Sequence, residues 1–185
     1  MYMRNTIKLL FSLLILIIAM GIFSIFKKPN KNIDLDKILK NKRSDLAIME
    51  IDEHLNKLSN YCEDIEKLNK SQKILIIIEN LEQEINNGGF HQFYFNSSGD
   101  FANETVEYLK IIKAEKTANI VTTANKQWEN GIVPKDRTER QIALETIEIK
   151  AKPIWEQCDN NFYKYQDNIA ELLIEFVKQN RIDFE

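Results

Sequence analysis

The chain has 185 residues, which is long enough for one domain with an appendage and for a real hydrophobic core. Its five glycines and three prolines allow few tight turns, so the composition favours helices over a many-stranded β fold. Residues 1–32 carry five basic side chains and no acidic one, whereas the remainder carries 20 basic and 28 acidic side chains, and this acidic surplus argues against direct binding of nucleic acid.

Residues 9–26 form an apolar segment without a charged side chain. At about 1.5 Å per residue this segment spans roughly 27 Å, close to the hydrocarbon thickness of a bilayer. A cleaved signal peptide fits less well, because the apolar run is long and no small-residue cleavage site separates it from the lysines that follow. The sequence therefore predicts a single-pass membrane protein, with a short tail at 1–8 and a transmembrane anchor at 9–26.

Residues 27–43 are rich in Lys and Asn and predict a basic juxtamembrane linker. More basic side chains follow the anchor than precede it, where only Arg4 and Lys8 lie. The positive-inside bias then predicts that the rest of the chain faces the cytoplasm.

Residues 44–181 have the periodicity of an all-α, compact multi-helix domain. After the predicted N-cap Ser44, apolar residues recur every three or four positions across 48–65, which predicts one helix facing the core. The pattern across 74–85 is apolar on most sides and predicts a central helix, which Gly88 and Gly89 should end.

Four more helices and a loop complete the predicted domain. Thr138 with Gln141 resembles a capping box at the start of a helix, and Pro153 should kink or end that helix. Asp167 should cap the last helix. The apolar spacing places these elements at 106–112, 117–128, 138–151 and 169–176, with a loop at 130–136.

The outer face of the first predicted helix is acidic. Its carboxylates outnumber Lys57 and Lys67, so the face is either an ordinary solvated surface or an interaction face for a basic protein partner. The candidate acidic face consists of Asp45, Glu50, Asp52, Glu53, Glu63, Asp64 and Glu66.

The segment 81–100, LEQEINNGGFHQFYFNSSGD, differs from the rest because glycines, amides and aromatics are concentrated in it. The glycines permit a sharp reversal, the aromatics can hold it in the core, and the amides can satisfy backbone groups left unpaired by a non-helical turn. This motif is predicted to be structural, and its residues are Asn86, Asn87, Gly88, Gly89, Phe90, His91, Gln92, Tyr94 and Asn96.

Chemical roles for the same segment are weaker alternatives. His91 with Glu82, Glu84 and Asp100 could ligate a metal, but the set lacks any known ligand spacing. His91 could instead act as a general base toward Ser97 or Ser98, and it has no evident orienting partner. A phosphate cradle is disfavoured because the glycines are expected to end a helix. Cys62 and Cys158 are expected to be reduced core thiols, a disulfide being the alternative. We predict no catalytic residue and no cofactor.

The run NNGGFHQFYFN resembles the hallmark of a bacterial domain family named after a DNA-mimic protein. The resemblance covers about residues 68–180 and includes VPKDR at 133–137 and DNNFYKY at 159–165. It implies an all-helical fold, no catalysis, and an acidic surface that imitates duplex DNA and occupies a DNA-binding protein. Mimicry requires dense rows of carboxylates, and lysines are scattered among the acids here, which puts that function in doubt for this chain.

These observations predict a membrane-anchored, non-enzymatic protein that binds a protein partner through an acidic or polar surface. The resemblance implies a basic DNA-binding protein as that partner. An immunity or antitoxin-like protein that neutralises a toxin, an enzyme or metal protein centred on His91, and a structural role in a membrane complex remain alternatives. The sequence leaves room for a homodimer and does not indicate direct contact with nucleic acid.

Overall fold

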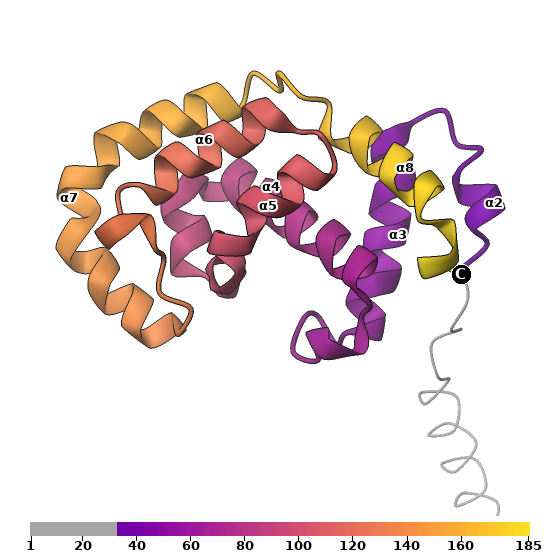
Figure 1. The fold of residues 1–185 in the computed structure, drawn as a ribbon, viewed down its shortest axis with the longest axis horizontal. Helices are drawn as coiled ribbons and strands as arrows, with labels where there is room; N and C mark the ends of the chain where they lie inside the picture. Colours follow the sequence, from indigo (N-terminus) through magenta and orange to yellow (C-terminus); the bar gives the residue numbers. More distant parts are fainter. Residues whose placement is uncertain (1–32) are drawn as a thin grey trace, which may run out of the picture. The chain divides into compact units, whose positions relative to one another are not determined.

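The computed structural model describes residues 33–185. Within them the chain is all-α and contains no strand, as predicted (Figure 1). The α-helices are α2 (Leu35–Ile38), α3 (Ser44–Leu58), α4 (Lys70–Phe95), α5 (Ala102–Ile111), α6 (Glu115–Asn125), α7 (Arg137–Phe162) and α8 (Ile169–Gln179). Short 3-10 turns are η1 (Ile65–Lys67), η2 (Ser97–Phe101), η3 (Glu129–Gly131) and η4 (Arg181–Asp183).

The membrane prediction is corrected by the structure. No helix in residues 33–185 is long and apolar enough to cross a bilayer, because the longest, α4 and α7, interrupt their apolar residues with charged ones. The predicted anchor at 9–26 lies outside the described residues. The predicted localisation as a single-pass membrane protein is therefore wrong on this evidence, and the cytoplasmic orientation, which was deduced from the anchor, falls with it.

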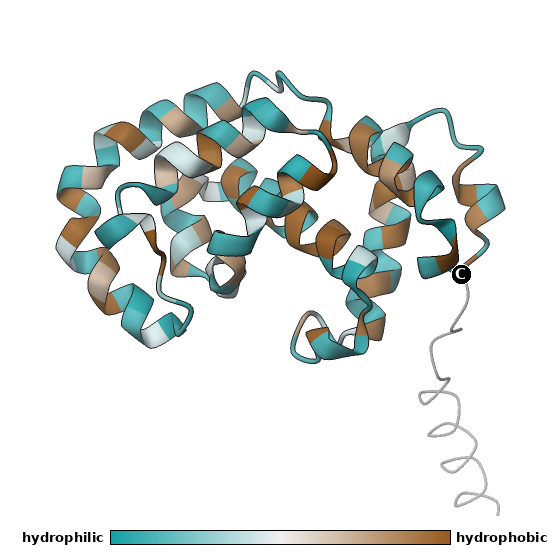
Figure 2. Ribbon diagram, viewed as in Figure 1, coloured by the Kyte–Doolittle hydropathy of each residue, from teal (hydrophilic) through white to brown (hydrophobic). Residues whose placement is uncertain are grey.

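Helix α4 is the centre of the domain, as its apolar pattern predicted. It packs against α3 at one end and against α5 and α7 at the other (Figure 1). Its residues Ile74 to Ile78, together with Leu81 and Ile85, are at most 3 % exposed. The inward faces of the helices are apolar and the outward faces polar, which is the distribution expected for a domain built on one core (Figure 2).

The two ends of the described chain meet beside α3. Helix α8 packs on α3, and Arg181 forms an ion pair of 2.8 Å with Asp36 of α2. Asn69, which caps α4 in a capping box with Gln72, also donates to the backbone oxygen of Asp183 at 2.7 Å. Residues 35–38, inside the segment expected to be a linker, thus form a short helix whose Leu35 and Ile38 are buried in the core.

Several helix boundaries differ from the prediction. The N-cap of α3 is Arg43 and not Ser44, and α7 is capped by Asp136 and not by Thr138. Helix α3 ends at Leu58, although the apolar spacing continues to Ile65. Helix α7 runs through Pro153, which is exposed, so the carbonyl that loses its hydrogen bond can be solvated. Helix α8 is capped by Asn168, and Asp167 instead accepts the backbone N–H of Thr117 at 2.8 Å, near the start of α6.

Candidate functional site

The two glycines of the predicted motif do not end helix α4 but kink it. Gly88 and Gly89 have non-helical backbone angles, and the helix resumes at Phe90. Gly89 has a φ of +72°, which glycine adopts without strain. Asp159 of α7 accepts the backbone N–H of Phe90 at 2.8 Å and so caps the resumed helix from another element. Burial raises the pKa of Asp159, and the Phe90 N–H opposes that rise.

The amides of the motif bind side chains around the kink, whereas the prediction had them satisfying its backbone groups. Glu84 accepts from Gln92 at 2.7 Å and from Asn96 at 2.9 Å. Asn86 donates to the hydroxyl of Tyr165 at 2.6 Å. These contacts lie within residues 81–100 or join them to the segment after α7, so they fix the kink.

The aromatics of the motif fill the core beside the kink. Phe90, Phe93 and Tyr94 are fully buried, and the ring of Tyr94 lies 5.1 Å from those of both Trp128 and Trp155. The Tyr94 hydroxyl donates to Asn125 at 2.7 Å. Phe95 does not follow the expectation that all four aromatics are buried, because it is 46 % exposed.

Sequence analysis missed the residue that anchors the end of α4. Arg140 of α7 is completely buried and donates to the backbone oxygens of Tyr94, Asn96, Pro134 and Lys135 and to Asp100 at 2.6 Å. A buried guanidinium needs this many acceptors to offset its loss of hydration. The only sequence signal was its place on the expected core-facing side of α7, where an arginine is normally read as exposed.

The structure does not assemble the chemical alternatives around His91. The imidazole is half exposed and lies 3.2 Å from Glu148, beside a cavity of about 560 Å³ between the kink and α7. Glu84 and Ser98 bind each other at 3.3 Å within the amide network, and Asp100 binds Arg140. Among residues 33–185, no group of three or more His, Cys, Asp or Glu side chains is placed to hold a metal ion.

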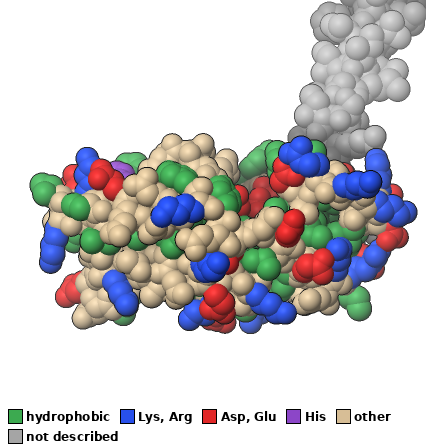
Figure 3. All heavy atoms as spheres, turned by 90° about the horizontal axis from the view of Figure 1, so that it is seen from above, with side chains coloured by type: hydrophobic (Ala, Val, Ile, Leu, Met, Phe, Trp, Pro, Cys, Tyr) green, Lys and Arg blue, Asp and Glu red, His purple; other side chains and the backbone are tan. Residues whose placement is uncertain are grey.

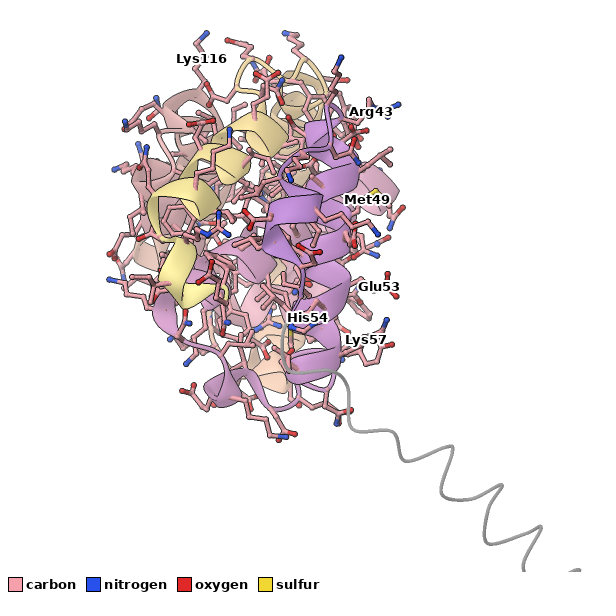
Figure 4. The ribbon with its side chains drawn as sticks, turned by 90° about the vertical axis from the view of Figure 1, so that its right-hand side faces the viewer. Arg43, Met49, Glu53, His54, Lys57 and Lys116 are labelled. Carbon is pink, nitrogen blue, oxygen red and sulfur yellow. The ribbon has the colours of Figure 1, made fainter. Side chains whose placement is uncertain are left out.

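The candidate acidic face is locally neutralised by cations. Because α3 ends at Leu58, its last three members, Glu63, Asp64 and Glu66, lie on the turn that follows and on η1. Exposed ion pairs join Asp45 to Arg43, Glu53 to Lys57, Asp64 to Lys67 and Glu66 to Lys73, at 2.5 to 2.6 Å. Figure 4 shows Glu53 and Lys57 projecting from the same side of α3.

Figure 3 shows basic and acidic side chains interspersed on another face of the domain. Exposed ion pairs of this kind contribute little to stability and exchange partners readily. The carboxylates therefore stay accessible to a competing cation, but they do not form a continuous row of one sign.

Carboxylates without cations lie in a groove between α3 and the first half of α4, here called the α3–α4 groove. It has a volume of about 780 Å³ and is lined by Asp52 from α3 and by Glu79 and Glu82 from α4. Burial, with the charges of Glu82 and Asp52, raises the pKa of Glu79 to about 8. Burial also raises the pKa of Asp52 to about 6, and it raises the pKa of Glu82.

One oxygen of Asp52 is unusually placed within this groove. Its Oδ2 accepts from Asn56 at 3.0 Å, whereas its Oδ1 is fully buried and has no hydrogen-bond partner among the described residues. Sequence analysis placed Asp52 on the acidic face but missed Glu79 as its neighbour. The signal was available, because Glu79, Glu82, Gln83 and Asn86 recur at helical spacing along one face of α4.

The model of the DMP19-like protein family matches residues 66–180. The chain belongs to this family. The match agrees with the resemblance expected over 68–180, and it contains the kink, Arg140 and the α4 wall of the groove. Helices α2 and α3 precede it, so the groove pairs a wall inside the DMP19-like region with a wall outside it. No curated protein and no solved structure matches the chain.

Proposed function

We propose that this DMP19-like domain is a non-enzymatic protein that binds a DNA-binding protein and keeps it from DNA. The family match over residues 66–180 carries the proposal, since the family suggests protein interaction by DNA mimicry. The surplus of acidic over basic side chains after residue 32 supports a basic partner.

The geometry supports a partner contact by exchange of ion pairs. Duplex DNA carries one charge per about 1.7 Å of axis, and four carboxylates of the acidic face, Asp45, Glu53, Asp64 and Glu66, are balanced by neighbouring cations. The lysines and arginines of a partner would displace Arg43, Lys57 and Lys73 from their carboxylates. The carboxylates would then pair with the partner's cations. The carboxylates are thus presented when the partner arrives and are neutralised in its absence.

A capture experiment with competing DNA tests the proposal. Proteins retained by the immobilised full chain are eluted with duplex DNA, and the affinity of an eluted protein is then measured from low to high salt. We expect DNA to displace the partner and the affinity to fall steeply as salt rises.

The proposal is wrong if the captured protein binds duplex DNA and this chain at the same time, or if its binding is indifferent to salt. A partner that does not bind DNA at all would favour the toxin-neutralising alternative. A matched pair of variants, Glu50→Gln on α3 and Glu148→Gln on α7, reports whether the contact is on the α3 side: only the first should weaken binding.

A further inference from the structure

The α3–α4 groove combines apolar walls with acidic lining. Met49 and Leu46 lie one helical turn apart on α3 and are 60 % and 45 % exposed, and Tyr61, after α3, is 73 % exposed. Figure 4 shows Met49 pointing away from the body of α3. Single exposed apolar residues are common, but three around one concave site are typical of an interaction surface.

Three acids of the groove have no cation in the described part of the chain, although Glu53, which also lines it, pairs with Lys57. Asp52, Glu79 and Glu82 form no ion pair within residues 33–185, in contrast to Asp45, Glu53, Asp64 and Glu66. The titratable groups beside them include the phenol of Tyr165, which affects Glu82 and Glu79, and the thiol of Cys62 near Asp52. Glu50, Glu53 and Tyr61 also line the groove. The nearby cation Lys57 is held by Glu53, so the groove has a surplus of acid.

We infer that the α3–α4 groove is a docking site for an arginine side chain carried by a flexible basic segment of the partner. The inference deepens the proposed function and rests on it only for the identity of the partner. An arginine suits the groove in both of its parts: its methylene stem can lie against Met49 and Leu46, and its guanidinium can reach the carboxylates.

The guanidinium also matches the groove in detail. Its five donors are fixed in one plane and can bond two carboxylates at once, and rotation of the Asp52 side chain would bring its buried, unpartnered Oδ1 within their reach. Its face can stack on the exposed ring of Tyr61. An ammonium offers three donors at one point and no plane, so lysine is expected to bind more weakly.

Arginine binding is expected to release a proton. Near neutral pH the raised pKa leaves Glu79 largely protonated, and a bound guanidinium lowers that pKa because it favours the ionised carboxylate. Binding therefore strengthens as pH rises toward 8, the pH at which Glu79 ionises in the free protein. A surface contact between exposed charges would show no such dependence.

The test uses the full chain and a blocked Gly-Arg-Gly-Arg-Gly peptide, with a citrulline-containing peptide of the same length as the uncharged control. Binding is followed by the NMR shifts of the Met49 methyl group and by calorimetry in two buffers of different ionisation enthalpy. We expect the arginine peptide to shift Met49 and to release a proton at pH 7, and the citrulline peptide to do neither.

Two neutralising variants locate the contact. Glu79→Gln and Asp52→Asn should each weaken the arginine peptide at pH 8 by about tenfold or more, and Glu148→Gln, outside the groove, should leave it unchanged. The inference is overturned if arginine and citrulline peptides bind alike, if Glu79→Gln behaves as Glu148→Gln, or if sedimentation shows a dimer that Met49→Asp dissociates, since the groove would then hold a second copy.

The two proposals fail separately. If a DNA-competing partner binds the groove variants as tightly as it binds the unchanged chain, the docking site is wrong and the proposed function stands. If the arginine peptide binds in the groove but no captured protein is displaced by DNA, the proposed function is wrong and the site stands.

Discussion

Replacing Gly89 by alanine tests whether Asp159 fixes the kink of α4. A Cβ added at Gly89 would lie 2.4 Å from Oδ2 of Asp159, so the carboxylate must move from the Phe90 N–H. The backbone angles of Gly89, φ +72° and ψ −172°, are used essentially by glycine alone and cost an alanine about 1–3 kcal/mol. Loss of a hydrogen bond to a carboxylate adds about 1.5–3 kcal/mol, so we expect Gly89→Ala to lower the free energy of unfolding by about 3–5 kcal/mol.

Gly131 supplies a matched control for this prediction. It has the same φ of +72°, but the nearest atom to an added Cβ is 4.0 Å away, so Gly131→Ala should lose only the backbone contribution of about 1–2 kcal/mol. Urea unfolding followed by circular dichroism compares the two. With a slope of about 2 kcal/mol per molar, Gly89→Ala should unfold roughly 1 M earlier than Gly131→Ala.

Equal losses in the two variants would refute the role of Asp159. If Gly89→Ala does not fold, Asp159→Asn provides the measurement, because the amide keeps the size of the carboxylate and removes its charge. This variant should lose about 1 kcal/mol, the difference between a charged and a neutral hydrogen bond. No loss would show that the kink is held by the amides and aromatics alone.

Three further predictions follow from the buried and titratable groups. Arg140→Lys should destabilise the domain by about 3 kcal/mol or more in urea unfolding, because one ammonium cannot serve the acceptors of the guanidinium, whereas Arg137→Lys on the surface should change stability by less than about 0.5 kcal/mol. The pKa of Glu79 is about 8 in the folded protein and 4.5 in the unfolded chain, so its contribution to stability is lost as pH rises from about 4.5 to 8. Glu79→Gln should therefore stabilise the domain by about 2–4 kcal/mol more at pH 9 than at pH 4. A stability difference that stays constant with pH would contradict the burial of that carboxyl. His91→Ala should leave partner binding within twofold and unfolding within about 1 kcal/mol, as measured by the capture assay and urea; loss of binding with retained folding would reopen a functional role for the imidazole.

The sequence predicted the helices where one pattern dominates. In the first half of α4 the apolar residues recur at helical spacing and are buried as expected, and α8 places Ile169, Leu173 and Phe176 in the core. Periodicity reports which side of a helix contacts the core, so it succeeds where one side of a regular helix faces the core along its whole length. The NNGGFHQ segment interrupts this helical spacing, which also marked it as irregular.

Periodicity failed where the chain continues to pack against the core after its helix has ended. Cys62 and Ile65 continue the apolar spacing of α3 and still pack against the core, but the backbone leaves the helix after Leu58. Asn60, Tyr61 and Cys62 all have positive φ, which asparagine tolerates and the other two residues rarely adopt. A left-handed turn built from such residues leaves no turn signature in the sequence.

Capping across the fold was likewise beyond sequence reasoning. Asp159 caps the resumed part of α4 and Asp167 binds the first turn of α6, at separations of 69 and 50 residues. A local capping rule compares residues three apart, so it assigned Asp167 to α8, where Asn168 serves instead. The candidate groove was missed for the same reason, since Asp52 and Glu79 belong to different helices.

The hydrogen bonds and ion pairs of the acidic side chains determine which of them can bind a basic partner. Glu84, Asp100 and Asp159 form hydrogen bonds within the fold, and two of the four acids of α3, Asp45 and Glu53, already have a cation nearby. The acidic surplus therefore exceeds the charge that is free to act. In the groove the position is reversed: Asp52 and Glu79 are desolvated without a cation. An incoming guanidinium gains most where the carboxylates have already lost water and salt screens least, so the groove should contribute more to affinity per charge than the whole exposed face of α3.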